Sequence, residues 1–137
     1  MGSDAVALVG GVVEGPVLVL DEPLSFWGGL DPATGAIIDR RHPQAGRVVT
    51  GCILLMPYGR GSSSSSAVLA EAIRLGTAPA AIVMRETDPI VMLGSLVAGE
   101  LYGIPCPVLV VPDDAYRLLG GARLLRVDGP SVTAPAP

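Results

Sequence analysis

The sequence predicts an α/β domain that combines a small parallel sheet with a β-rich N-terminal part. Two strand–helix–strand units follow one another in the middle of the chain, an order typical of a parallel sheet covered by helices. The residues before these units are rich in Val and Leu and are interrupted by Gly and Pro, which favours strands and turns. The chain has 137 residues, half of them hydrophobic, which is enough for one domain with a continuous core.

The N-terminal third is expected to consist of strands and turns. Two segments, AVALVGGVVEG (residues 5–15) and PVLVLDEP (residues 16–23), carry the aliphatic and β-branched side chains that strands favour. The later segment DPATGAIIDRRHP (residues 31–43) contains Asp-Pro and Thr-Gly steps, which predict a hairpin or a looped excursion.

Between these segments lies SFWGG, which comprises Ser25, Phe26, Trp27, Gly28 and Gly29 and holds the chain's only Phe and only Trp. The two glycines permit backbone angles and close approaches that other residues do not. One interpretation is an aromatic core anchor followed by a turn. The alternative is that these residues form the wall of a site or a subunit contact.

The first strand–helix unit starts with VVTGCILLM, which predicts a buried strand over Val48–Met56 that ends at Pro57. A run of serines follows, and then apolar residues recur at the spacing of one helical face as far as Leu75. Gly76 stands where a helix of this kind stops.

The second unit has clearer boundaries. Asp88 and Pro89 form an N-cap and first-turn pair, and Gly103 is the expected end of the helix that they begin. The predicted elements are a strand over Ala80–Met84, this helix through Tyr102, and strands over Cys106–Pro112 and Arg123–Asp128. The segment RETDP, Arg85 to Pro89, follows a strand's carboxyl end, where ligands of α/β sheets bind, but helix capping by Asp88 is the favoured role.

The C-terminal segment GPSVTAPAP contains little that a core could bury. Residues 1–129 are therefore expected to form the domain, and residues 130–137 a flexible tail.

Charge and hydrophobic patterning exclude several functional classes. All nine basic residues are arginine, and the net charge of −4 offers no footprint for nucleic acid. No apolar run approaches the roughly 18 residues of a membrane-spanning helix, and the first residues, MGSDAV, match neither a signal peptide nor a myristoylation site. We expect a cytoplasmic protein with no membrane and no nucleic-acid partner.

The chain offers no metal-ligand pattern. Cys52 and Cys106 stand apart in apolar, strand-like runs, and they are interpreted as buried free thiols. His42 is the only histidine, and together with Arg40 and Arg41 it is expected to form a solvated turn, with subunit docking as the alternative.

The most unusual stretch is GRGSSSSS, in which five serines, Ser62 to Ser66, lie between a predicted strand and a predicted helix. A flexible linker would separate independently folded pieces, whereas here a helix begins at once. A helix N-terminus presents free N–H groups and the positive end of the helix dipole, so this turn could accept a carboxylate or phosphate. Simple N-capping is the alternative, but it needs only one serine.

Two familiar enzyme motifs are missing from this stretch. It lacks the lysine and the spacing of a P-loop, which argues against nucleotide binding. It is also not a G-x-S-x-G turn, and His42 has no evident carboxylate to orient it, so a hydrolase triad is disfavoured.

The region from about Gly10 to Val111 resembles the small subunit of aconitase X, the swivel-domain half of a split dehydratase. The motifs DEPLSFWGG and GRGSS carry most of this resemblance. The resemblance implies an aconitase-type swivelling β/β/α domain and a hydro-lyase that removes water from a hydroxy-carboxylate only when its large subunit is present.

The resemblance also implies residue roles. In aconitases a serine from a Gly-Ser-Ser turn acts as an alkoxide base, and in this sequence that position is Ser62, after Gly61. Ser63 and Ser64 would hold the substrate carboxylate. Ordinary aconitases place an arginine where this chain has Ser64, and Arg60 is the candidate for the compensating cation.

The implied cofactor is an iron–sulfur cluster that the large subunit holds, because two separated cysteines cannot supply the usual three or four thiolates. Substrates of aconitase X relatives include cis-3-hydroxy-L-proline and mevalonate 5-phosphate. Arginine-only usage suggests a GC-rich bacterium and so favours the hydroxyproline. A different functional class, a non-catalytic ligand-binding or scaffold domain, stays open as the alternative.

Overall fold

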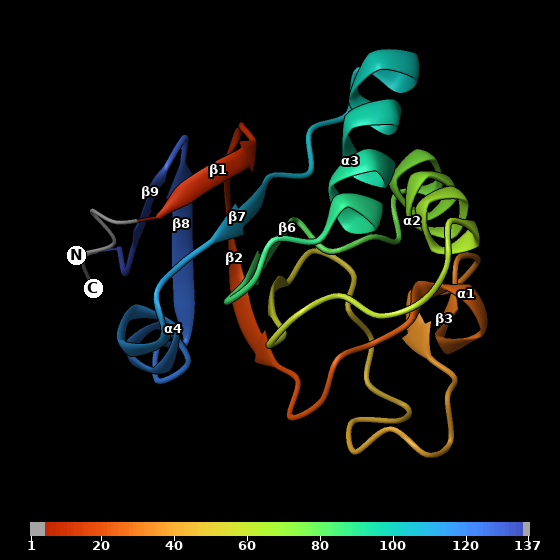
Figure 1. Cartoon of the computed structure of the whole chain (residues 1–137), viewed down its shortest axis with the longest axis horizontal. Helices are drawn as coiled ribbons and strands as arrows, with labels where there is room; N and C mark the ends of the chain where they lie inside the picture. The colour runs from red at the N-terminus through yellow and green to blue at the C-terminus, as the bar shows by residue number, and fades with distance from the viewer. Residues whose placement is uncertain (1–4, 136–137) are drawn as a thin grey trace.

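A computed structural model describes residues 5–135 of the chain, and its framework is a mostly parallel sheet (Figure 1). Within these residues the main sheet has seven strands in the order β1-β7-β6-β5-β2-β8-β9. Its four central strands run parallel: β2 (Val12–Val19), β5 (Ile53–Leu55), β6 (Ala81–Met84) and β7 (Val108–Val110). The α/β class and the parallel arrangement predicted from the sequence are confirmed.

The sheet curls, and the connection between its first two strands requires this curvature. Strand β1 (Val6–Val9) pairs antiparallel with β7, while β2 pairs with β5 and with β8 (Leu124–Asp128). Only two glycines, Gly10 and Gly11, join β1 to β2, although four positions separate these strands across the sheet. Such a short link can join them only if the sheet bends back toward itself.

Strands β5 and β6 are buried on both faces, so their alternate residues enter two different cores. Leu54 and Met56 pack with the helix residues Leu69 and Ile73 on one face. Ile53 and Leu55 point to the other face, which holds side chains of α4, β8 and β9. A continuous apolar strand between two helix or strand layers accounts for the unbroken hydrophobic runs of the sequence.

Helices α2 (Ser64–Leu75) and α3 (Pro89–Tyr102) stand side by side on the first face (Figure 1). Both end at a glycine in the left-handed conformation, Gly76 and Gly103, as the sequence predicts. The Asp88 carboxylate accepts hydrogen bonds from the N–H groups of Ile90 and Val91, so its predicted capping role is confirmed.

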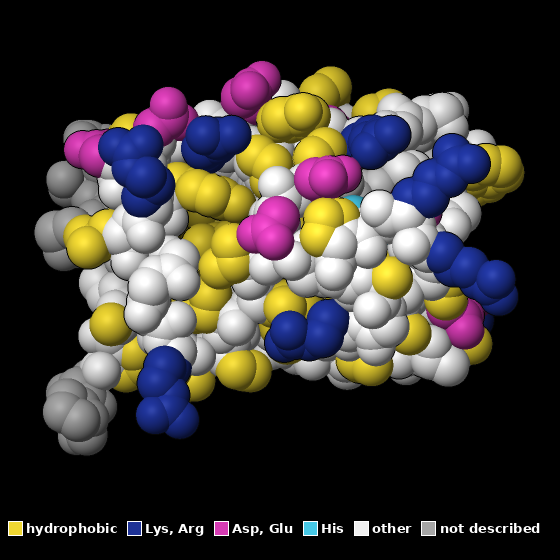
Figure 2. Space-filling view, turned by 90° about the horizontal axis from the view of Figure 1, so that it is seen from below, with side chains coloured by type: hydrophobic (Ala, Val, Ile, Leu, Met, Phe, Trp, Pro, Cys, Tyr) yellow, Lys and Arg dark blue, Asp and Glu magenta, His cyan; other side chains and the backbone are white. Residues whose placement is uncertain are grey.

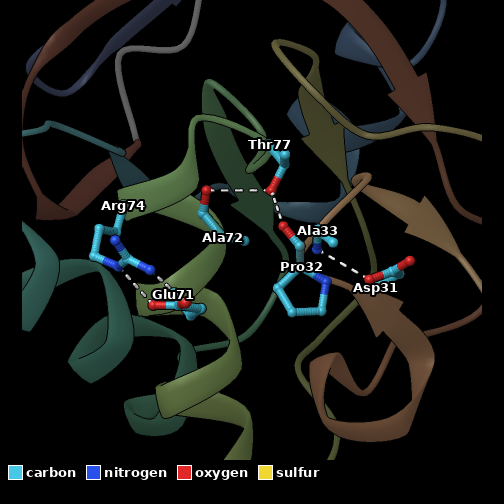
Figure 3. A network of polar contacts seen from close by, with 7 residues as sticks. All are labelled: Asp31, Pro32, Ala33, Glu71, Ala72, Arg74 and Thr77. Carbon is cyan, nitrogen blue, oxygen red and sulfur yellow. Dashed lines mark hydrogen bonds and ion pairs between the residues drawn. The ribbon is translucent and has the colours of Figure 1, made fainter.

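The looped excursion predicted near residue 31 is a small hairpin of β3 (Leu30–Asp31) and β4 (Ala36–Ile37). Its turn is fastened to the end of α2, because the Thr77 hydroxyl donates to the Pro32 carbonyl at 2.6 Å and also reaches the Ala72 carbonyl (Figure 3). Asp31 accepts from the Ala33 N–H within the turn. These contacts hold the hairpin against the helical layer.

The structure corrects two of the predicted secondary-structure elements. The strand predicted over Val48–Met56 is regular only over β5, because the chain turns at Thr50 and Gly51, where Gly51 has φ 73°. A short helix, α4 (Asp113–Leu119), was not expected.

The expectation of a flexible tail over residues 130–137 is wrong for β9 (Ser131–Thr133), which pairs antiparallel with β8. The Val132 side chain is fully buried beside Leu125 and Val127. Residues 136 and 137 of the predicted tail lie outside the described residues.

The buried Val132 gives a direct test of this C-terminal strand. Val132→Ala should lower the free energy of unfolding by about 2 kcal/mol, because it removes two buried methyl groups and leaves a small cavity. Ser131→Ala, at an exposed position of the same strand, is the control and should change it by less than about 0.5 kcal/mol. Urea unfolding measures both values, and equal stability of the two variants would show that the segment does not pack.

Candidate functional site

The chemistry-bearing residues gather at the edge of the sheet where the parallel strands end. Strand β2 points toward the lower edge in Figure 1, and Figure 2 looks directly onto that edge, where arginine side chains surround carboxylates and apolar groups. The connections that follow β2, β5 and β6 all start here. Ligands of open α/β sheets commonly bind at this edge.

The serine run forms the start of α2, and its first three side chains face solvent. Ser62, Ser63 and Ser64 are exposed, and within residues 5–135 their hydroxyls make no hydrogen bond. Ser63 is the cap residue by position, yet its side chain does not cap the helix. The simple capping interpretation therefore does not account for these three serines.

The last two serines of the run point inward. Ser65 is buried, and its hydroxyl accepts from the Trp27 N–H at 3.2 Å and lies 3.4 Å from the Ser25 hydroxyl. The Ser66 hydroxyl donates to the Ile90 carbonyl at 2.6 Å, at the start of α3. These two residues fasten the start of α2 to its neighbours, whereas the first three serines stay exposed.

Two glycines flank Arg60 and let the chain pass through a narrow space. A Cβ on Gly59 would overlap the Asp88 carboxylate, and a Cβ on Gly61 would lie 2.5 Å from the hydroxyls of both Ser25 and Ser65. Gly61 also has φ 114°, which side-chain-bearing residues rarely adopt. Arg60, between them, pairs with Ser25 through its backbone and exposes its side chain.

The two aromatic residues of the SFWGG segment lie in different environments. Phe26 is fully buried and is a core anchor, whereas the Trp27 side chain is 61% exposed beside the serine run. The segment forms a single kinked turn, α1 (Phe26–Gly29), in which Gly28 has φ 79°. An exposed Trp next to a candidate site is consistent with a wall or a subunit contact, and that role stays a prediction.

His42 corrects the expectation of a solvated turn. Arg40 and Arg41 are exposed, but His42 is 6% exposed and both ring nitrogens are engaged. The Gln44 N–H donates to Nδ1, so the proton is on Nε2, which donates to the Glu22 carbonyl at 3.0 Å. No local pattern indicates this burial, because the Glu22 carbonyl lies 20 positions away along the chain.

A second polar cluster follows β6 and β7. The Arg85 guanidinium lies 5.4 Å from the Tyr116 ring centre and 4.0 Å from the Asp113 carboxylate. Burial raises the pKa of Tyr116 to about 12, and the Arg85 charge opposes this rise only in part. These contacts connect α4 to the segment that follows β6.

The cysteines do not resemble metal ligands. Cys106 is buried, its thiol donates to the Pro79 carbonyl, and burial raises its pKa to about 12. Cys52 is half-buried, and burial also raises its pKa. Within residues 5–135 no three His, Cys, Asp or Glu side chains are grouped to hold a metal ion. The residues of this chain therefore do not fit an iron–sulfur cluster.

The described part of the chain also lacks any helix whose length and hydrophobicity would let it cross a bilayer.

A family model and a solved structure both match this chain over nearly its whole length. Residues 3–134 match the family model for the aconitase X swivel domain. The crystal structure of aconitase X from Thermococcus kodakaraensis, in its holo-form, superimposes with a TM-score of 0.82 and 31% identity, and the match covers 97% of each chain.

Two relatives differ in how much of their length the chain covers. Cis-3-hydroxy-L-proline dehydratase of Pseudomonas aeruginosa is 50% identical, and the match covers 90% of this chain but only 23% of the relative. The phosphomevalonate dehydratase small subunit of Methanopyrus kandleri is 48% identical, and the match covers 82% of this chain and 86% of the relative. The chain thus spans about a quarter of one relative and most of the other.

The inward position of Ser65 predicts a structural role that its exposed neighbours lack. Ser65→Ala should destabilise the fold by about 1–3 kcal/mol, because the Trp27 N–H loses its acceptor in a part-buried site. Ser64→Ala, at the exposed helix start, should change stability by less than about 0.5 kcal/mol. Thermal and urea unfolding compare them, and an unchanged Ser65→Ala variant would contradict this assignment.

Proposed function

Because this chain belongs to the aconitase X swivel-domain family, we propose that it is the small subunit of a two-chain hydro-lyase. The enzyme would remove water from a hydroxy-carboxylate. The observation that carries the proposal is the set of exposed, uncommitted hydroxyls at the start of α2, where backbone N–H groups and the helix dipole favour an anion. A helix that needed only a cap would not keep three such serines.

Ser62 is proposed as the base. Its hydroxyl would have to act as an alkoxide, and a free serine is far too weak an acid for this at neutral pH. The N-terminus of α2, with its backbone donors and the neighbouring Arg60, supplies positive potential at this position. The alkoxide then takes the proton from the carbon next to the carboxylate, a carbon–carbon double bond forms, and the C–O bond breaks to release hydroxide. Return of the proton from the Ser62 hydroxyl to this hydroxide gives water and restores the alkoxide.

Substrate binding is assigned to the residues around this base. The N–H groups and hydroxyls of Ser63 and Ser64 are proposed to hold the substrate carboxylate, with Arg60 as the nearby cation. The backbone of Gly61 is proposed to contact the substrate as well, and this position requires glycine because a side chain would collide with the hydroxyls of Ser25 and Ser65.

The preferred substrate is cis-3-hydroxy-L-proline, which the name of the Pseudomonas aeruginosa relative supports. Mevalonate 5-phosphate is the alternative, which the name of the Methanopyrus kandleri relative supports at nearly equal identity. Assaying the assembled enzyme on both compounds decides between them, and activity on neither would exclude both.

The partner is proposed to be the aconitase X large subunit, since the small-subunit relative is matched over most of its length. The departing hydroxyl requires a Lewis acid, and we assign that chemistry to an iron–sulfur cluster in the large subunit, because the two cysteines here cannot hold one. We expect the assembled enzyme in the cytoplasm. Trp27 is proposed to contact the large subunit or to line the shared site.

Ser62→Ala tests the base directly. In the assembled enzyme this variant should slow proton abstraction by at least about 10²-fold, the low end for general acid–base catalysis. The measurement is deuterium exchange from solvent at the substrate's α-carbon, which reports the proton step without water loss. Folding and subunit association should stay unchanged, because the Ser62 side chain is exposed and makes no hydrogen bond within residues 5–135.

Ser131→Ala, far along the chain on β9, is the matched serine control and should exchange at the wild-type rate. Exchange at the wild-type rate in Ser62→Ala would remove this residue from catalysis. The non-catalytic ligand-binding alternative would then be favoured, with the serine run as its ligand-holding element.

Dependence on the partner gives a separate prediction. The chain purified alone should fold, show no iron–sulfur absorbance and turn over neither compound, because half of the site is missing. Adding the large subunit to the wild-type chain should give turnover. Adding it to the Ser62→Ala chain should not. Turnover by the isolated chain would refute the two-chain assignment.

A further inference from the structure

An open, polar cavity of about 550 Å³ lies next to Arg60, which comes just before the serine run. Three arginines are among its lining residues, Arg40, Arg41 and Arg60, together with the acidic residues Glu22 and Asp39. Its volume falls within the range usual for small-molecule sites. Arg60 connects the cavity to the proposed catalytic turn, because only Gly61 separates it from Ser62.

The three arginines of this cavity have no ion pair among the described residues, where the paired arginines are Arg74, Arg85 and Arg126. Of the two carboxylates, Asp39 already accepts from the Arg41 backbone N–H. Three guanidiniums against two carboxylates leave the lining with one excess positive charge, in a chain whose net charge is −4.

The loop that carries Arg40 and Arg41 is held in place by a clamp at the carboxyl end of β2. His42 donates from Nε2 to the Glu22 carbonyl. Gln44 closes a two-point contact with Asp21, since its side-chain oxygen accepts from the Asp21 N–H at 3.0 Å and its amide donates to the Asp21 carboxylate at 2.8 Å. These contacts fix the loop without using either arginine side chain.

Arg40, Arg41 and Arg60 are exposed and have no ion pair among the described residues, so these side chains contribute little to the stability of the fold. Arginine presents planar, paired donors that match the oxygens of a carboxylate or phosphate. A bound oxyanion could accept hydrogen bonds from several of these donors at once. No other described contact gives these three side chains a structural task.

We propose that this cavity is an oxyanion-binding subsite, in which Arg40, Arg41 and Arg60 hold an anionic group of the enzyme's small-molecule substrate. That the ligand is the substrate rests on the proposed function. Because Ser62, Ser63 and Ser64 do not line the cavity, the group is a second anion, separate from the carboxylate held at the start of α2. Mevalonate 5-phosphate carries such a second anion and cis-3-hydroxy-L-proline does not, so the subsite favours the alternative substrate over the preferred one. His42 and Gln44 are positioning residues for it.

A small molecule fits the cavity better than an acidic side chain of a partner does. The lining mixes guanidiniums with carboxylates, so a partner's acidic loop would meet Glu22 and Asp39 as well as the arginines. A compact ligand can contact the guanidiniums alone, or can also offer a cationic group to the carboxylates.

The test on the isolated chain uses inorganic phosphate and acetate as probes at constant ionic strength. Arginine Nε–H resonances should shift saturably with at least one probe in the wild type. Arg40→Gln with Arg41→Gln should weaken that affinity by about tenfold or more, because charged hydrogen bonds are lost. The matched control, Arg117→Gln with Arg123→Gln, makes the same charge change outside the cavity and should leave it intact.

Shifts that do not saturate, or that persist equally in the Arg40 and Arg41 variant, would overturn the subsite. Phosphate binding without acetate binding would indicate a phosphorylated substrate, and the reverse a carboxylate group. Both of these outcomes support an oxyanion site.

The assembled enzyme then identifies the occupant. The Arg40 and Arg41 variant should raise KM by about tenfold or more with little change in kcat, whereas Ser62→Ala should lower kcat. Weaker subunit association at an unchanged KM would overturn the small-molecule proposal in favour of a partner's acidic side chain. Because Ser62→Ala is measured separately, failure of this subsite and failure of the proposed base are distinguishable.

Discussion

The chain between β5 and α2 has no room for a side chain at two alternate positions, and this constraint sets the geometry of the whole edge. Gly59 lies against the Asp88 cap of α3, and Gly61 lies against the hydroxyls of Ser25 and Ser65. The starts of α1, α2 and α3 are therefore brought together around one short segment. Arg60, between the two glycines, is the position in that segment whose side chain is free to face solvent.

The parts that could be predicted from the sequence are those whose signals are local. Helix α3 begins at Asp88 and Pro89 and ends at Gly103, and each of these residues acts within one turn of its own position. The position of the serine run is predictable in the same way, because a strand pattern precedes it and a helix pattern follows it directly. Helical spacing could also have shown that Ser65 is buried, because it shares a face with Leu69 and Ala72.

The parts that could not be predicted depend on partners far along the chain. Val132 is buried because β9 pairs with β8 at the margin of a curled sheet, and nothing in GPSVTAPAP indicates that pairing. The burial of His42 depends on the Glu22 carbonyl. The three arginines line one cavity because the contacts of Gln44 with Asp21 hold the loop of Arg40 and Arg41 in place. Long-range contacts of this kind carry no periodic signal in the sequence.

The edge exposes hydroxyls, free N–H groups and unpaired guanidiniums to water, and this arrangement costs the isolated domain little, because water satisfies each group. In high dielectric the same groups also bind anions weakly and could hardly stabilise an alkoxide. Their strength increases only when a second surface excludes water and lowers the local dielectric. The exposure of these groups therefore fits the proposed function, in which the large subunit closes over this edge and excludes water.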